Sequence, residues 1–106
     1  MDKMLKYKSI LKELMQERIA YPNEDYPYYK DLIIADDVQN HFVHIFTGWE
    51  KGDYFYDVLI HLALEEEKVV IYENNTDIPM EEWLVNEGIL LEDIVHQKEE
   101  VFSSAS

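Results

Sequence analysis

The side chains best suited to chemistry in this 106-residue chain are its histidines and the carboxylates near them. There are four histidines and no cysteine, so a metal site would have to rest on imidazole and carboxylate ligands. His41 and His44 are three residues apart, and on a strand this spacing points their side chains to opposite faces. This pair is therefore excluded from sharing a metal ion.

His44 and His61 are a second combination, because the strand pairing derived below makes them diagonal neighbours on one face, with Asp57 on the same side. Two imidazoles beside a carboxylate are typical of a metal or acid–base site. No third and fourth metal ligand is evident, so polar groups within a mostly apolar interface are the simpler interpretation. A small metal-dependent enzyme that uses His44, Asp57 and His61 stays an alternative.

Other catalytic patterns are missing from the sequence. The acidic runs Asp36-Asp37 and Glu65-Glu66-Glu67 lack the ordered spacing of a calcium-binding loop and are typical of solvated turns. The chain has three glycines, and they form neither a phosphate-binding loop nor a nucleophile elbow. We therefore expect a protein that is not an enzyme and has no cofactor.

The net charge of −14 is unevenly distributed. Residues 1–18 carry five basic and three acidic side chains, which leaves a net charge of −16 on the remainder. Affinity for nucleic acid depends on basic side chains that displace counterions, so direct binding to duplex DNA is not expected. The acidic surface either keeps the protein soluble or fits a basic partner. The sequence shows no signal peptide or membrane span, which favours a cytoplasmic protein.

A β-sheet must position these residues, and residues 41–73 show three segments with two-residue periodicity separated by two polar turns. The turn at Glu50-Lys51-Gly52-Asp53 predicts a hairpin in which Trp49 faces Tyr54, and a constant register then places Phe42 opposite His61. The turn at Glu66-Glu67 predicts a second hairpin, with Leu62 opposite Ile71 and His61 opposite Tyr72.

These registers sort the side chains into two faces. One face is continuously apolar and is predicted to form the core; its members are Val43, Ile45, Trp49, Val58, Ile60, Leu62, Leu64, Val69 and Ile71. The other is too apolar to be left in water and yet carries polar groups; its members are Phe42, His44, Phe46, Phe55, Asp57, Leu59, His61, Val70 and Tyr72.

The remaining segments complete a single α+β domain over residues 1–106. The spacing of apolar residues predicts an amphipathic helix from residue 2 to about residue 20, and Leu32–Asp36 is predicted to be a first strand. A second helix is predicted over Ile78–Gly88, capped by Thr76 or Asp77. The expected fold is an N-terminal helix, a four-stranded antiparallel meander, a second helix and a short extended C-terminal segment, with both helices on the core face.

The order of several short motifs resembles one known family. These are Asp36, His41-Phe42, Gly48-Trp49, Val58-Leu59-Ile60-His61, Thr76-Asp77, Leu84-Val85-Asn86-Glu87-Gly88-Ile89 and Glu92-Asp93-Ile94-Val95. Together, over roughly residues 2–96, they resemble the XisI-like family, the fdxN element excision controlling factors of cyanobacteria. Glu66-Glu67 departs from the family, which commonly has glycine in that turn, and the C-terminal tail lacks the segment with proline and arginine.

The resemblance implies an accessory factor that assists a programmed DNA rearrangement in heterocysts, together with a companion protein, XisH, of nuclease-like fold. A DNA-binding accessory factor is the second hypothesis, and it would depend on the basic first helix alone. The second sheet face is predicted to be covered by another molecule, in the simplest form a second copy in a homodimer. The predicted interface residues are Phe42, His44, Phe46, Phe55, Leu59, His61, Val70 and Tyr72.

Overall fold

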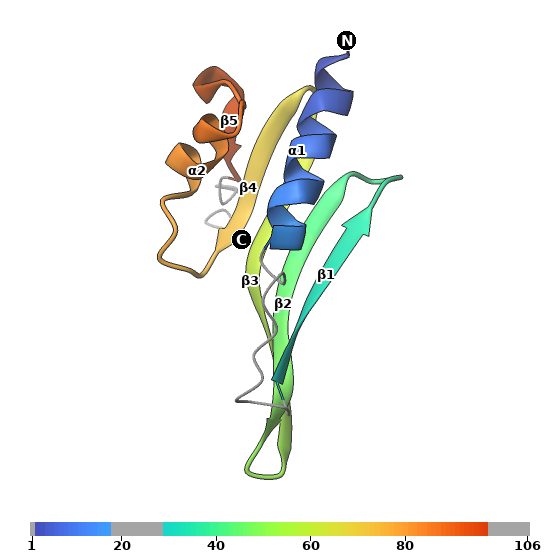
Figure 1. Ribbon diagram of the computed structural model, residues 1–106, viewed down its shortest axis with the longest axis vertical. Coiled ribbons are helices and arrows are strands. Elements are labelled where there is room, and N and C mark those ends of the chain that lie inside the picture. Colours follow the sequence, from blue (N-terminus) through green and yellow to red (C-terminus); the bar gives the residue numbers. More distant parts are fainter. Residues whose placement is uncertain (1, 18–28, 98–106) are drawn as a thin grey trace, which may run out of the picture.

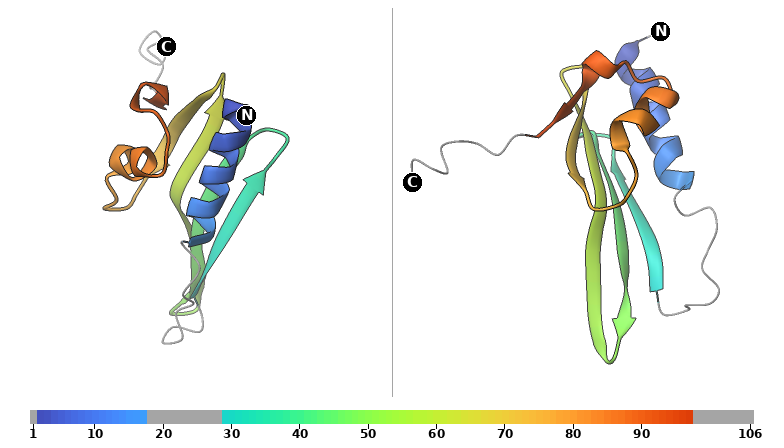
Figure 2. Two further views of the ribbon diagram at one scale, coloured as in Figure 1. Left: turned by 45° about the horizontal axis from the view of Figure 1, so that its top comes forward. Right: turned by 90° about the vertical axis from the view of Figure 1, so that its left-hand side faces the viewer.

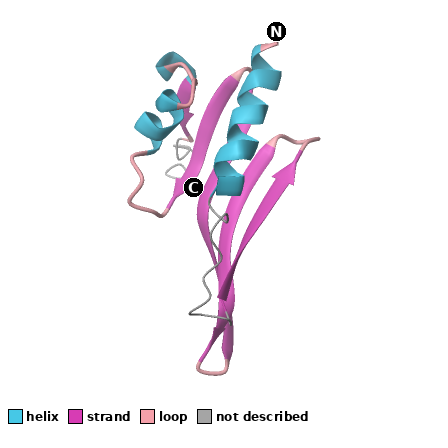
Figure 3. Cartoon of the chain, viewed as in Figure 1, coloured by secondary structure: helices cyan, strands magenta, loops and turns pink. Residues whose placement is uncertain are grey.

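A computed structural model describes residues 2–17 and 29–97, which form two α-helices and one five-stranded sheet (Figures 1 and 3). The elements, in chain order, are α1 (Lys3–Glu17), β1 (Tyr29–Asp36), β2 (His41–Glu50), β3 (Asp53–Glu65), β4 (Lys68–Asn74), α2 (Met80–Asn86), a 3-10 helix η1 (Leu91–Asp93) and β5 (Ile94–His96). Strands β1 to β4 are sequential and antiparallel. The α+β fold predicted from the sequence is confirmed.

The C-terminal segment differs from the prediction because part of it is a fifth strand. β5 pairs in parallel with β4, so that Val69 lies opposite Ile94 and Ile71 opposite His96. A parallel neighbour needs a crossover connection, and α2 with η1 supplies it. The sequence signal, the single apolar pair Ile94-Val95, is too short to show an alternating pattern.

The core lies between the helices and one side of the sheet. On α1, Tyr7, Leu11, Leu14 and Met15 are buried at helical spacing, as the amphipathic pattern requires. Figure 2 shows both helices on the same side of the sheet, which is the side predicted for Ile60 and Ile71. Residues after Glu17, where α1 was predicted to continue, lie outside the described part of the chain.

α2 is shorter than the segment predicted for it. Pro79 occupies the N-cap position without a side-chain cap, and the Thr76 hydroxyl instead accepts a hydrogen bond from the Ile78 N–H at 3.1 Å. Gly88 leaves the helix at a φ of 113°, a left-handed exit that glycine makes without strain.

The two ends of the described chain are joined by a buried polar contact. The Tyr7 hydroxyl donates to Asp93 Oδ2 at 2.6 Å and accepts from the Leu90 N–H at 3.2 Å. Lys3 Nζ lies 3.1 Å from the same carboxylate. The hydrogen bonds from Tyr7 and Lys3 hold the pKa of Asp93 below its usual value, so the carboxylate stays charged.

Two β-bulges interrupt the predicted registers. Trp49 lies opposite Tyr54 as predicted, and this register holds up to Ile45 opposite Val58. His44, however, lies opposite Ile60, so Leu59 is an extra residue in β3. The second hairpin starts in the predicted register, with Leu62 opposite Ile71, and then gains one extra residue at Tyr72 in β4.

The bulges correct the predicted faces. Phe42 lies opposite Leu62 instead of His61, and His61 lies opposite Glu73 instead of Tyr72. Beyond an extra residue, the side chains of one strand point to the opposite face relative to those of its partner strand. Phe42 is therefore in the core with Ile60. Trp49, predicted to lie in the core, is 55% exposed near the end of the long β2–β3 hairpin.

Both hairpin turns have backbone conformations that glycine and asparagine favour. Lys51 and Gly52 have φ values of 52° and 85°, and Glu66 and Glu67 have φ values of 52° and 64°. Two consecutive positive φ angles are the signature of the tight turns that match strand twist. The Glu66-Glu67 turn therefore holds two non-glycine residues in a costly conformation.

Replacing this turn by Asn-Gly should stabilise the fold. We expect Glu66→Asn with Glu67→Gly to raise the free energy of unfolding by about 1 kcal/mol, because the pair is preferred in such turns and relieves the left-handed strain. Urea denaturation measures the change. A double variant as stable as the parent, or less stable, would contradict this account of the turn.

Core truncation at Ile60 tests whether this residue belongs to the core. Ile60 is fully buried, so Ile60→Ala should cost about 2–5 kcal/mol. Val38 is 88% exposed, and Val38→Ala should change stability by no more than about 0.5 kcal/mol. Equal effects of the two substitutions in the same denaturation experiment would show that Ile60 is not a core residue.

Candidate functional site

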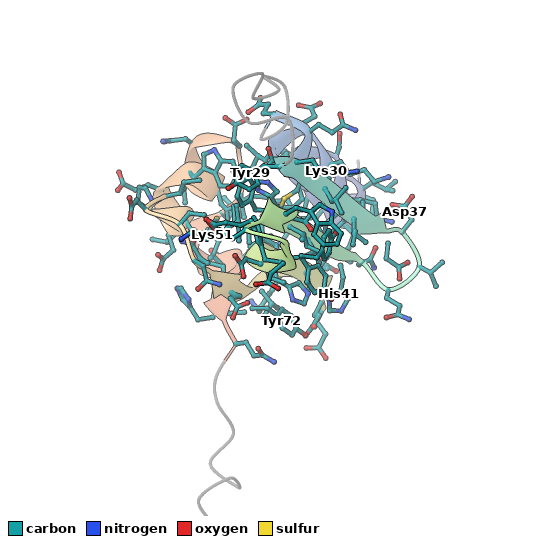
Figure 4. All side chains as sticks on the ribbon, turned by 90° about the horizontal axis from the view of Figure 1, so that it is seen from below. Tyr29, Lys30, Asp37, His41, Lys51 and Tyr72 are labelled. Carbon is teal, nitrogen blue, oxygen red and sulfur yellow. The ribbon has the colours of Figure 1, made fainter. Side chains whose placement is uncertain are left out.

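The side of the sheet away from α1 and α2 is the candidate site, and we call it the helix-free face. Strand alternation and the observed registers place on it the charged residues Lys30, Asp36 and Glu73. They also place on it the apolar, aromatic and histidine residues Leu32, Ile34, His41, Val43, Ile45, Trp49, Tyr54, Tyr56, Val58, His61, Val70 and Tyr72. Figure 4 shows His41 and Tyr72 on one side of the sheet and Tyr29 on the other. No helix among residues 2–17 and 29–97 covers this face (Figure 2).

One end of the helix-free face is aromatic. Trp49, Tyr54 and Tyr56 are 55%, 54% and 66% exposed near the tip of the β2–β3 hairpin. The rings of Trp49 and Tyr54 meet edge to face with centroids 5.1 Å apart. Exposed aromatic side chains on a rigid strand pair lose little freedom on contact, which makes them common anchors of protein interfaces.

The other end of the face holds a histidine pair. His41 Nδ1 and His61 Nε2 are 2.8 Å apart, so the N–H of one ring donates a hydrogen bond to the nitrogen of the other. The ring of Tyr72 stacks on His61 at a centroid distance of 4.6 Å and lies 5.3 Å from His41. The Tyr72 hydroxyl in turn donates to Glu65.

The surroundings of His61 and Tyr72 favour their uncharged forms. Burial lowers the pKa of His61, and the positive charge of a protonated His41 lowers it further. The hydrogen bond to Glu65 raises the pKa of Tyr72, so its hydroxyl stays protonated. His61 and Tyr72 therefore favour uncharged, stacked rings on this face.

Phe42 and His44, both predicted on the second face, are on the helix-bearing side instead. Phe42 is fully buried in the core, and His44 is 1% exposed with its Nε2 2.8 Å from Asp31 Oδ1. The assignment was wrong because it assumed a register without the bulge at Leu59. His44 and His61 therefore lie on opposite faces.

Phe46, Phe55 and Leu59 are corrected in the same way. Phe46 and Phe55 pack with Tyr29 in a three-ring cluster on the helix-bearing side, with centroids 5.6–5.7 Å apart. Leu59, the bulged residue, is partly buried against the core. Asp57 lies opposite Phe46 on this same side, away from His61.

Three of the predicted interface residues, His61, Val70 and Tyr72, do lie on the helix-free face. The trio of His44, Asp57 and His61 is not brought together, and within the described residues no group of three or more metal-ligating side chains could hold an ion. The prediction missed His41 because the constant register places it opposite Leu62, on the face away from His61. It also missed the exposed aromatic tip, because Trp49 was assigned to the core.

A small pocket lies beside the end of β4 and the start of α2. Its volume is about 390 Å³, and His96 and Glu81, which form an ion pair at 3.0 Å, are among its lining residues. The His96 ring lowers the pKa of Glu81 by its hydrogen bond. The pair is exposed and provides no catalytic arrangement.

Comparison with known proteins identifies the family. The model of the XisI protein family matches residues 1–102. The chain belongs to the XisI family. A XisI-like protein from Anabaena variabilis has a similar crystal structure, with a TM-score of 0.76 and 27% identity over 86% of this chain and 83% of that one.

A second solved structure has the same fold. It is the fdxN element excision controlling factor XisI from Anabaena variabilis, with a TM-score of 0.74 and 20% identity over 89% of this chain and 90% of that one. At this identity the likeness to XisI concerns the fold alone. A comparison with curated proteins finds no match. No helix in the described residues has both the length and the apolar character needed to cross a bilayer.

The histidine pair predicts a pH dependence that NMR can follow. His61 should titrate below its ordinary value of 6.5, and His41→Gln should raise its midpoint, because one of the two causes that lower its pKa is removed. The unfolded chain takes up this proton more readily than the folded one. The stability that neutral His61 contributes is thus present above pH 6.5 and is lost as the pH falls through the lower folded value.

The control for this titration is His96→Gln, because His96 is exposed and paired with Glu81. This variant should leave the His61 midpoint where it is. A midpoint at or above 6.5 in the parent protein, or no response to His41→Gln, would contradict the assigned pair.

Proposed function

We propose that this protein is a non-enzymatic accessory factor that controls excision of a DNA element by binding a companion protein. The observation that carries the proposal is the helix-free face, with its exposed aromatic end and its histidine pair, on a chain of net charge −14. Membership of the XisI family supports the regulatory role. The companion we propose is an XisH-like protein of nuclease-like fold.

The composition of the helix-free face supports a protein partner. Interface centres are depleted in charged residues and enriched in aromatic ones, and energetic hot spots are most often Trp, Tyr and Arg. Trp49, Tyr54 and Tyr56 fit this description and protrude on a long hairpin. A companion that handles DNA has a basic surface, which complements the acidic remainder of this chain.

The ion pairs of α1 weigh against the alternative of a DNA-binding accessory factor. That alternative needs the lysines of α1, yet Lys3 lies 3.1 Å from Asp93 and Lys12 lies 2.7 Å from Asp37. Lys8 Nζ also donates to the Asp37 carbonyl at 3.5 Å. These amines are already used to hold α1 on an acidic body, so few positive charges are left to displace counterions from a phosphate backbone.

Companion binding is the test of the proposal. The protein and an XisH-like protein from the same genome, produced together, should elute as one complex in size-exclusion chromatography. Tyr56→Asp should weaken this complex at least about tenfold, because it places a charge at a desolvated aromatic contact. The matched control is Leu5→Asp on α1, where Leu5 is 60% exposed on an element outside the helix-free face, and it should bind like the parent.

A DNA titration separates the two hypotheses. The isolated protein should show no salt-sensitive binding to duplex DNA at concentrations where nonspecific binders act, about 10⁻⁴–10⁻⁶ M. Binding in that range would favour the DNA-binding alternative. Absence of a complex with the companion, or equal binding by Tyr56→Asp and Leu5→Asp, would refute the proposed surface.

A further inference from the structure

Strand β1 lies at one edge of the sheet. In the described residues β1 has a single neighbour, β2, and it pairs with that strand over eight residues without a bulge (Figure 1). The strand contains no proline. Open edges of this kind pair readily with another strand, and proteins usually blunt them with short length, proline or bulges. β1 has none of these three protections. It does carry a fourth, charged side chains, in Lys30, Asp31 and Asp36.

The side chains of β1 form a self-complementary pattern on the helix-free face. In order along the strand they are Lys30, Leu32, Ile34 and Asp36, one cation and one anion at the ends and two apolar residues between them. Leu32 and Ile34 are 38% and 50% exposed. Such a sequence of charges and apolar groups matches itself when it is reversed.

An antiparallel pair of β1 strands with a two-fold axis at Ile33 uses this pattern fully. It puts Lys30 opposite Asp36 of the other copy, and Leu32 opposite Ile34, on both sides of the axis. Moving the axis to Leu32 would instead place Lys30 opposite Ile34. The axis at Ile33 alone satisfies both the charged and the apolar positions.

The side chains of β1 on the helix-bearing side are also compatible with this two-fold axis. Asp31, whose Oδ1 lies 2.8 Å from His44 Nε2, would face Ala35 of the second copy, so no two carboxylates oppose each other. This matters in a chain of net charge −14, because two such molecules repel each other over most of their surfaces. Along the stripe from Lys30 to Asp36 on the helix-free face, the charges sum to zero.

We propose that the protein forms a homodimer by pairing β1 with β1 of a second copy in the register Lys30–Asp36 and Leu32–Ile34. The two five-stranded sheets then continue as one. The two-fold axis is perpendicular to the sheet, so both helix-free faces point the same way and form one extended surface. This inference is independent of the companion, because it rests on the edge of the sheet instead of its face.

Charge reversal at the edge tests the register. Sedimentation velocity of the whole protein should show a species of twice 12.7 kDa that grows with concentration. Lys30→Glu puts like charges opposite each other twice in the symmetric dimer, and it should raise the dissociation constant at least about tenfold. Lys51→Glu, with the same change of charge at the distant hairpin tip, is the matched control and should dimerise like the parent.

Complementation gives the sharper result. Asp36→Lys should also be monomeric alone, while an equimolar mixture with Lys30→Glu should dimerise. In the mixed dimer the two introduced charges have opposite signs and face each other, and the native Asp36 of one copy faces the native Lys30 of the other.

The fold of the Asp36→Lys variant is checked first by circular dichroism, because Asp36 Oδ1 accepts hydrogen bonds from the N–H groups of Val38 and Gln39. Ile34→Lys is the second variant if that one does not fold. Ile34 is half exposed, so its replacement should disrupt the dimer without touching the turn.

Three outcomes would overturn the proposal. The first is a parent protein that is monomeric at every soluble concentration. The second is a dimer that survives Lys30→Glu and Ile34→Lys but is lost in Tyr56→Asp, which would locate it on the helix-free face. The third is a monomeric parent whose companion complex is lost in Lys30→Glu, which would assign the edge to the companion.

Discussion

One extra residue in β3, Leu59, determines which side chains lie on which side of this sheet. Up to Val58 the β2–β3 hairpin follows a constant register from its tip, and beyond Leu59 the alternation is reversed. The reversal directs Ile60 and Leu62 to the helices and sends His61 to the opposite face. A second extra residue, Tyr72, repeats the adjustment in β4 and brings its ring onto His61. The core and the candidate site both depend on these bulges.

The sequence was sufficient to predict the elements because their signals are local. The helical spacing of α1, the glycine in the Lys51-Gly52 turn and the proline before α2 all act within a few residues. The face of each residue was harder to predict, because it depends on every position between it and the turn. Val58, Leu59 and Ile60 are all apolar, so the two-residue period gives no sign of where one residue is skipped.

The candidate site was therefore predicted only in part. Tyr72 was placed correctly because the bulge leaves it on the side of Val70, whereas Phe42 and His44 moved to the helix-bearing side. The His41–His61 contact could not be predicted, because it forms between two strands whose pairing is shifted by the bulge. The distribution of charge was a better guide than the strand pattern. The concentration of lysines in residues 1–18 agrees with the ion pairs that they form with acids elsewhere in the chain.

The contact between Tyr7 and Asp93 has a consequence for how the protein is made. The two residues are 86 positions apart, so the contact forms only after most of the chain has been synthesised. At about 5–20 residues per second, α1 leaves the ribosome several seconds before the segment that carries Asp93. In that interval Tyr7 cannot form its native hydrogen bond with Asp93. A chain that stops short of η1 lacks this contact, and α1 is then held on the sheet by its apolar face and by ion pairs such as Lys12–Asp37.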